Sequence, residues 1–430
     1  MEKRIYPELQ EQVFWSTLEN GLTVAVVPRP GFTKKLAYFV TDYGSIHTGF
    51  TLNGEALQAP DGVAHFLEHK MFDLPGRDVT AEFAALGAVP NAFTSYDMTA
   101  YYFSCTENFA ESLALLLEFV STPYFTEESV AKEQGIIGQE IGMNEDNPDT
   151  RVFENLMLAM YRQHPIRFPI LGTRETIGQI TPQVLHQCHR AFYHPGNMLL
   201  CVVGDVDPEQ VAAIARKQLP PASGDTVSRP KQWDEEMTCP QSQIAASMEV
   251  AMPMFQLGFK SEPLGFGEAA VRAEVIGDLA AEALFGESSP LYLKLYEEGL
   301  IDSSFGGGFE TVEGMSMLTA SGDSDNPEAV RDAILAAAEE LARQGIRDED
   351  FARMKRSALG RRIRDLDSFD ATCFRICAYH FSGFDYFRFP AVYRDVTVAE
   401  IQNFIKTAVT QQRCSLSVIY PTEEVNYESQ

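Results

Sequence analysis

Short apolar runs alternate with helical stretches through the first half of the chain. Residues 22–27 and 36–40 are rich in β-branched and aromatic residues, which is typical of strands. Residues 100–104 and 199–203 predict further strands, whereas residues 107–120 space their apolar positions along one helical face. Strand and helix signals that follow each other in this way predict a mixed α/β fold.

Cap residues predict where three helices begin. Thr126, followed by two glutamates, is expected to cap a long helix that continues through Ile141. Asp207 and Pro208 fit the cap and first position of a later helix, and Asp61 is expected to cap the helix that begins near residue 63.

A segment rich in turn residues separates the two halves of the chain. Residues 220–240 are rich in proline and other turn residues without a sustained period, which predicts a linker. Beyond it the order of elements resembles the first half, which suggests a duplicated fold. The predicted elements there are helices at 269–284, 327–344 and 349–364 and a strand at 315–321. We expect a catalytic, zinc-binding domain at 1–220, a linker at 221–240 and a structurally similar domain without metal at 241–430.

Composition narrows the class of protein. The 430 residues carry 34 Lys+Arg against 61 Asp+Glu, a net charge of −27, which disfavours nucleic acid as a partner. Hydrophobic residues make up 45%, enough for substantial cores. No apolar run approaches the roughly 18 residues that span a membrane, and the N-terminal residues lack the apolar core of a signal peptide. Seven cysteines without a C-x-x-C pair predict reduced, packed thiols, so we expect a cytoplasmic protein.

One five-residue motif combines residue types that bind metal ions and transfer protons. His65 and His69 stand four residues apart with Glu68 between them, so a helix would place both imidazoles on one face. This H-x-x-E-H order is the inverzincin pattern, in which one Zn²⁺ binds both histidines and the glutamate acts as general base. A zinc hydrolase also needs a third ligand, which composition alone does not single out. The alternative is a pair of histidines on a solvent-facing helix.

The motif and its context resemble the pitrilysin/insulinase family of zinc metallopeptidases, in particular two-domain bacterial members similar to mitochondrial processing peptidase. In that family a helical glutamate some seventy residues downstream is the third ligand, seven positions after another glutamate. The resemblance therefore implies one Zn²⁺ per chain on His65, His69 and Glu140, with Glu133 as a supporting residue in catalysis and Glu68 as general base. It also implies hydrolysis of short, extended peptides.

The resemblance covers essentially the whole chain. Residues 91–95 fit the strand beside the zinc to which a peptide substrate adds, so the implied substrate-binding residues are Asn91, Ala92, Phe93 and Thr94. The implied fold is α+β, with two similar α/β-roll domains facing each other as a clamshell around a peptide chamber. Residues 288–292 and 296–300 are most similar to bacterial paralogues associated with lysine modification of elongation factor P.

One departure from the family affects function. Single-chain active members carry an Arg and, seven residues later, a Tyr, which bind substrate at the scissile carbonyl. Here Tyr296 stands in place of the Arg, and the segment ends one residue earlier on Asp302. We therefore expect a homodimer or a heterodimer with a paralogous subunit that supplies the pair. The alternative is a peptide-binding or assembly subunit with a vestigial zinc site.

Three further features have weaker implications. His186 and His189 are expected on the surface rather than in a second metal site. The glycine-rich residues 305–309 lack the Lys and Ser/Thr of a phosphate-binding loop and are expected to be a mobile strand or a substrate-contacting loop. The acidic balance of the chain favours basic peptides as substrates.

Overall fold

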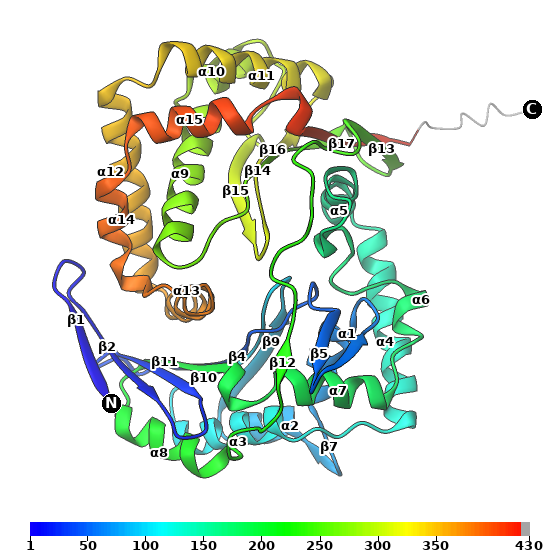
Figure 1. Cartoon of the computed structure of the whole chain (residues 1–430), viewed down its shortest axis with the longest axis vertical. Coiled ribbons are helices and arrows are strands. Elements are labelled where there is room, and N and C mark those ends of the chain that lie inside the picture. Colours follow the sequence, from blue (N-terminus) through cyan, green and yellow to red (C-terminus); the bar gives the residue numbers. More distant parts are fainter. Residues whose placement is uncertain (423–430) are drawn as a thin grey trace, which may run out of the picture. The chain divides into compact units, whose positions relative to one another are not determined.

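The computed structural model describes residues 1–422, which form two compact units (Figure 1). The first unit comprises residues 1–141, 169–230 and 360–390, and the second comprises 142–168, 231–359 and the remainder from 391. Each unit is therefore built from both halves of the sequence. The domain boundaries expected at residues 220 and 241 stay a prediction.

The first unit is organised on a seven-stranded sheet in the order β1-β2-β3-β11-β4-β10-β9. Strands β3 and β11 run parallel, and all other neighbours are antiparallel. Every residue of β11 is buried, as expected for a central strand. The strands are β1 (Glu2–Tyr6), β2 (Glu11–Thr17), β3 (Thr23–Pro28), β4 (Lys35–Thr41), β9 (Ala88–Thr94), β10 (Thr99–Cys105) and β11 (Met198–Gly204). A three-stranded sheet has the order β12-β5-β6, formed by β5 (Gly49–Leu52), β6 (Glu55–Gln58) and β12 (Val227–Ser228), and β7 (Asp73–Leu74) pairs with β8 (Arg77–Asp78).

Alternate residues of the central strand face two different helical layers. Leu200 and Val202 belong to the main core, together with residues of the motif helix, whereas the Cys373 thiol lies against the Cys201 carbonyl on the other side. Cys373 lies on α13, which packs on β11 and β4. The helices of this unit are α1 (Val63–Met71), α2 (Val79–Ala85), α3 (Phe109–Ser121), most of α4 (Glu127–Glu145), α6 (Arg174–Ile177), α7 (Pro182–Phe192), α8 (Pro208–Gln218) and α13 (Phe369–Phe381).

The second unit repeats this topology. Its sheet has the order β13-β17-β14-β16-β15, with one parallel pair, β13 and β17, followed by antiparallel neighbours. This is the pattern of β3-β11-β4-β10-β9, so the expected duplication is confirmed. The strands are β13 (Gln243–Met248), β14 (Met254–Ser261), β15 (Gly306–Val312), β16 (Met315–Asp323) and β17 (Cys414–Pro421).

One helix on the second sheet comes from the first half of the chain. Helix α5 (Pro148–Met160) packs on β13, β14 and β17, and a Cβ at Gly258 would collide with Met160 of this helix. Thus α5 joins the second unit while α13 joins the first, and the two halves exchange a helix. The other helices of this unit are α9 (Glu268–Phe285), α10 (Pro290–Glu297), α11 (Pro327–Gln344), most of α12 (Asp348–Arg364), most of α14 (Phe389–Asp395) and α15 (Val398–Ala408).

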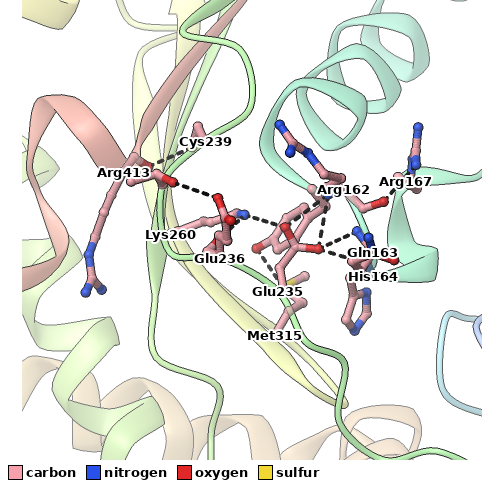
Figure 2. Close-up of polar contacts among 12 residues, drawn as sticks. Arg162, Gln163, His164, Arg167, Glu235, Glu236, Cys239, Lys260, Met315 and Arg413 are labelled. Atoms are coloured by element: carbon pink, nitrogen blue, oxygen red, sulfur yellow. Dashed lines mark hydrogen bonds and ion pairs between the residues drawn. The ribbon is translucent and has the colours of Figure 1, made fainter.

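A buried ion pair fixes the end of α5 (Figure 2). The Glu235 carboxylate accepts hydrogen bonds from the backbone N–H groups of Arg162, Gln163 and His164 and pairs with Lys260 at 2.8 Å. Neither side chain of the ion pair is more than 7% exposed. Four donors on one carboxylate satisfy a charge that would otherwise be costly to bury.

Most of the expected helix starts and thiol states are confirmed. Thr126 accepts a hydrogen bond from the backbone of α4, and Asp207 caps α8. The cap predicted at Asp61 is wrong: Gly62 holds this position at φ 91°, where its close approach to the Leu171 carbonyl leaves no room for a side chain.

All seven cysteines are free thiols. Within residues 1–422, no helix is long and apolar enough to cross a membrane.

Candidate metal centre

Helix α1 presents the two motif histidines side by side. The imidazole rings of His65 and His69 lie 4.6 Å apart between centroids, as expected for positions one turn apart. Every residue of this helix except His69 is buried, so packing fixes the helix on all sides. The alternative of a solvent-facing pair is therefore wrong for His65, which is 7% exposed.

Helix α4 brings Glu140 to both rings. Its carboxylate oxygens lie 3.6 Å from Nε2 of His65 and 3.7 Å from Nε2 of His69. One ligand atom from each of the three residues lies within 4.8 Å of the others, and no other such group occurs among the described residues. Two imidazole nitrogens and one carboxylate are a donor set that Zn²⁺ takes in catalytic sites, so the residues fit this ion.

Glu133 orients one of the imidazoles. Nδ1 of His69 donates a hydrogen bond to Oε1 of Glu133 at 3.0 Å, which leaves Nε2 directed at Glu140. Burial acts to lower the pKa of His69, but the hydrogen bond and charge of Glu133, with the nearby carboxylates, outweigh it and raise the pKa. A carboxylate behind a histidine ligand fixes the ring and raises its basicity.

His65 is held in its neutral form. Burial, and then the neighbouring His69, lower the pKa of His65 to about 3, so the ring is uncharged at neutral pH. Its Nδ1 is buried and has no hydrogen-bond partner within residues 1–422. A neutral imidazole with Nε2 facing a carboxylate and a second imidazole is suited to bind a cation without first losing a proton.

Glu68 lies on the same helix but has a different partner. It is 8% exposed, and its Oε2 accepts a hydrogen bond from Oγ1 of Thr94 at 2.6 Å. Burial raises the pKa of Glu68, and the Thr94 hydroxyl and the His69 charge partly oppose this shift. A carboxyl group with a raised pKa beside a candidate metal centre can take and return a proton.

Strand β9 supplies the four residues expected to bind substrate. This strand ends the sheet and pairs only with β10, so its outer edge has no neighbour in the described sheet. Thr94 contacts Glu68, Phe93 lies against Tyr102 with centroids 6.3 Å apart, and the Asn91 side chain bonds the next backbone N–H, that of Ala92. An open edge is able to accept another extended strand.

The sequence analysis does not single out Lys70, a side chain beside the site. Lys70 follows His69 directly, is 1% exposed, pairs with Asp73 and lies 4.0 Å from Glu133. The signal in the sequence is a cation within an otherwise apolar helical stretch next to the motif.

One secondary expectation is wrong in part, and for another the structure selects between two alternatives. His189 is buried rather than on the surface, and its ring bonds the Val120 carbonyl at 3.2 Å, whereas His186 is exposed. Of the two alternatives for the glycine-rich segment, a strand or a loop, the structure shows a strand, because Gly306 begins β15. A Cβ at Gly307 would collide with the Phe285 ring of α9, so the absence of a side chain allows the helix to pack closely on this strand.

Comparison with known proteins identifies the family of this chain. Residues 46–174 match the family described as insulinase (peptidase family M16), and residues 179–358 match the peptidase M16 inactive domain. An uncharacterized zinc protease, YmfH of Bacillus subtilis, is 37% identical over 426 residues, covering 97% of this chain and 98% of the relative. These matches identify a two-domain relative of zinc proteases. The chain belongs to the M16 family of insulinase-like peptidases.

Two solved structures share the architecture. A putative M16-like peptidase from Alicyclobacillus acidocaldarius superposes with a TM-score of 0.91 at 32% identity, covering 96% of this chain and 99% of the other. A protease from Helicobacter pylori gives a TM-score of 0.79 at 21% identity, covering 96% and 100%, and shows the likeness of fold alone. The expected α+β fold with two similar M16 domains is confirmed. The narrower likeness to elongation factor P paralogues stays a prediction.

Proposed function

We propose that this protein is a zinc-dependent endopeptidase that hydrolyses short, extended peptides. The observation that carries the proposal is the convergence of His65, His69 and Glu140 within 4.8 Å, with Glu68 on the same helix. Glu140 comes from a separate helix 71 positions after His69, so local sequence alone does not bring these groups together.

Each residue has a defined task in this proposal. His65, His69 and Glu140 hold one Zn²⁺ per chain, which when bound lowers the pKa of a water molecule and polarises the peptide carbonyl. Glu68 accepts a proton from the attacking water and passes it to the leaving amine. Glu133 supports catalysis by holding the ring of His69 through Nδ1.

The substrate adds to the sheet as an extended strand along β9. The unpaired edge formed by Asn91, Ala92, Phe93 and Thr94 supplies backbone groups to a peptide. Because Thr94 bonds Glu68, a peptide aligned there runs close to the proposed general base. A chain with net charge −27 favours basic peptides over acidic ones.

A partner subunit completes the enzyme. Tyr296, which is 55% exposed on α10, stands where single-chain members carry the substrate-binding Arg. Loss of one donor that stabilises a developing oxyanion costs about 10²–10³ in rate, so a paralogous subunit that carries the pair is expected. A second copy of this chain has the same Tyr296 and would form a homodimer without restoring the pair. The seven free thiols support a reducing, cytoplasmic location.

The test is turnover of a quenched fluorescent peptide library by zinc-loaded protein, purified alone and with candidate paralogues from the same cell. Glu68→Gln, which keeps the shape of the side chain but removes the base, is the background control. Turnover that is lost in Glu68→Gln supports the proposal. Stoichiometric zinc without turnover under any pairing contradicts it.

The absence of the Arg and Tyr pair favours a second function, a peptide-binding or assembly subunit. In that case the chain binds extended peptides along β9 but does not cut them. Fluorescence anisotropy of labelled peptides, with products followed by mass spectrometry, separates binding from hydrolysis.

A further inference from the structure

Lys70 occupies an unusual place for a cation. It lies on α1 directly after His69 and is 1% exposed, although a buried ammonium group is costly unless anions and acceptors surround it. Its neighbours on this helix are apolar or belong to the motif, so packing alone does not require a charge at this position.

The partners of Lys70 come from two elements. Nζ pairs with the Asp73 carboxylate, just after α1, and on α4 it lies 3.5 Å from the Ser129 carbonyl and 4.0 Å from Oε2 of Glu133. Ser129 and Glu133 are one helical turn apart, so they face the same cation. Lys70 therefore connects the helix that carries both histidines to the helix that carries Glu140.

Glu133 divides its two oxygens between two partners. Oε1 accepts from Nδ1 of His69 at 3.0 Å, and Oε2 faces Lys70. The Glu133 side chain is 13% exposed, so water provides little alternative solvation. A cation on Oε2 keeps the carboxylate in the rotamer that presents Oε1 to His69.

We propose that Lys70 is a positioning residue of the metal centre: it acts through Glu133 to hold the His69 ring and to fix α4 against α1. The inference rests on the proposed zinc site and adds a determinant of its metal affinity. Asp73, whose side chain is 47% exposed, remains solvated when Lys70 is replaced, so the main consequence falls on Glu133.

The experiment measures the zinc dissociation constant by competition with a chromogenic chelator, without a substrate. Lys70→Met, Glu133→Gln and the double variant are compared with wild type, and far-UV circular dichroism verifies folding. Lys34→Met is the matched control, because Lys34 is an exposed lysine with one carboxylate partner, Asp370. We expect Lys70→Met to weaken zinc binding about tenfold, the lower end of the range for residues behind a ligand.

The zinc affinity of the double variant distinguishes a positioning role of Lys70 from a general structural role. If Lys70 acts through Glu133, the double variant binds zinc as Glu133→Gln does, and the two losses do not add. Unchanged affinity in Lys70→Met, or a further tenfold loss in the double variant, overturns the inference. If Lys70→Met fails to fold, the comparison of Glu133→Gln with the double variant decides.

Folding of the double variant and zinc binding by wild type separate a failure of this inference from a failure of the proposed function. A double variant that fails to fold while Glu133→Gln folds overturns the inference, because Lys70 would then serve the fold independently of Glu133. If wild type itself binds no zinc, the proposed function fails at that step, before any comparison of variants. If wild type binds zinc and the variants do not differ, only the role of Lys70 is refuted.

Discussion

The hydroxyl of Thr94 donates a 2.6 Å hydrogen bond to the Glu68 carboxylate and so links the edge strand β9 to the motif helix α1. The donor stabilises the ionised carboxylate and opposes the upward pKa shift that burial causes. In the proposed mechanism, Thr94 therefore links the strand that binds substrate to the group that transfers the proton.

We predict that Thr94→Val raises the pKa of Glu68 further, because the ionised form loses its donor. The acidic limb of the kcat/KM profile then moves to higher pH, and kcat/KM at pH 6 falls about tenfold. Thr94→Ser keeps the hydroxyl and is the matched control. A profile of unchanged shape in Thr94→Val would show that the hydrogen bond does not tune Glu68.

Glu140→Gln is predicted to remove stoichiometric zinc. The amide keeps the size of the side chain but provides no anionic oxygen to the cluster with His65 and His69. The measurement is metal per chain after gel filtration, by plasma mass spectrometry. Glu128→Gln, an exposed glutamate in the first turn of the same helix, is the control and should retain wild-type zinc. Equal zinc in both variants would exclude Glu140 as a ligand.

Glu235→Gln is predicted to destabilise the second unit by about 3 kcal/mol, because Lys260 keeps its charge in a fully buried place without its carboxylate partner. Urea unfolding followed by circular dichroism measures the loss. Glu236 is the matched control: its side chain is exposed and only its backbone carbonyl contacts Lys260. Glu236→Gln should change the free energy of unfolding by less than about 0.5 kcal/mol. Similar effects of the two substitutions would contradict this account.

A buried histidine predicts a pH dependence of stability. Burial lowers the pKa of His164 to about 4, below the value of an exposed histidine, despite its hydrogen bond to the Glu313 carbonyl and the charge of Glu235. The unfolded state therefore binds more protons between pH 6.5 and 4, and stability falls as pH drops through this window. The slope contributed by His164 is at most about 1.4 kcal/mol per pH unit.

His164→Gln tests this contribution, since the amide retains a donor for the Glu313 carbonyl. Unfolding free energies at pH 4.5, 5.5 and 7.5 should show a shallower pH dependence in the variant. Subtracting the two curves removes the effect of the other buried histidines. Parallel curves for wild type and variant would assign the pH dependence to other groups.

The sequence predicted well where the physical signal is local. Periodicity and cap residues placed α11 at 327–344 and the start of α8 at Asp207, because helix ends depend on nearby donors and acceptors. Asp61 failed as a cap because the Leu171 carbonyl, 109 positions later, sets the local geometry at Gly62. Tertiary contacts of this kind have no local signature.

The candidate site also contains residues with a local sequence signal and residues whose role depends on tertiary contacts. His65, Glu68 and His69 follow from helical spacing, whereas Glu140 follows only from the family resemblance, since nothing local distinguishes it from other helical acids. The hydrogen bond from Thr94 and the burial of Lys70 depend on the packing of β9 and α4 against α1. Sequence spacing contains no information on these distances.

The exchange of α5 and α13 has a consequence for synthesis on the ribosome. The first sheet receives α13 only when residues 369–381 have left the exit tunnel, long after its own strands are complete. The second sheet needs its last-made strand, β17, which also forms part of the surface beneath α5. Nascent chains therefore expose apolar sheet surface until translation is nearly finished, which makes them candidates for chaperone binding and for aggregation if translation stops early.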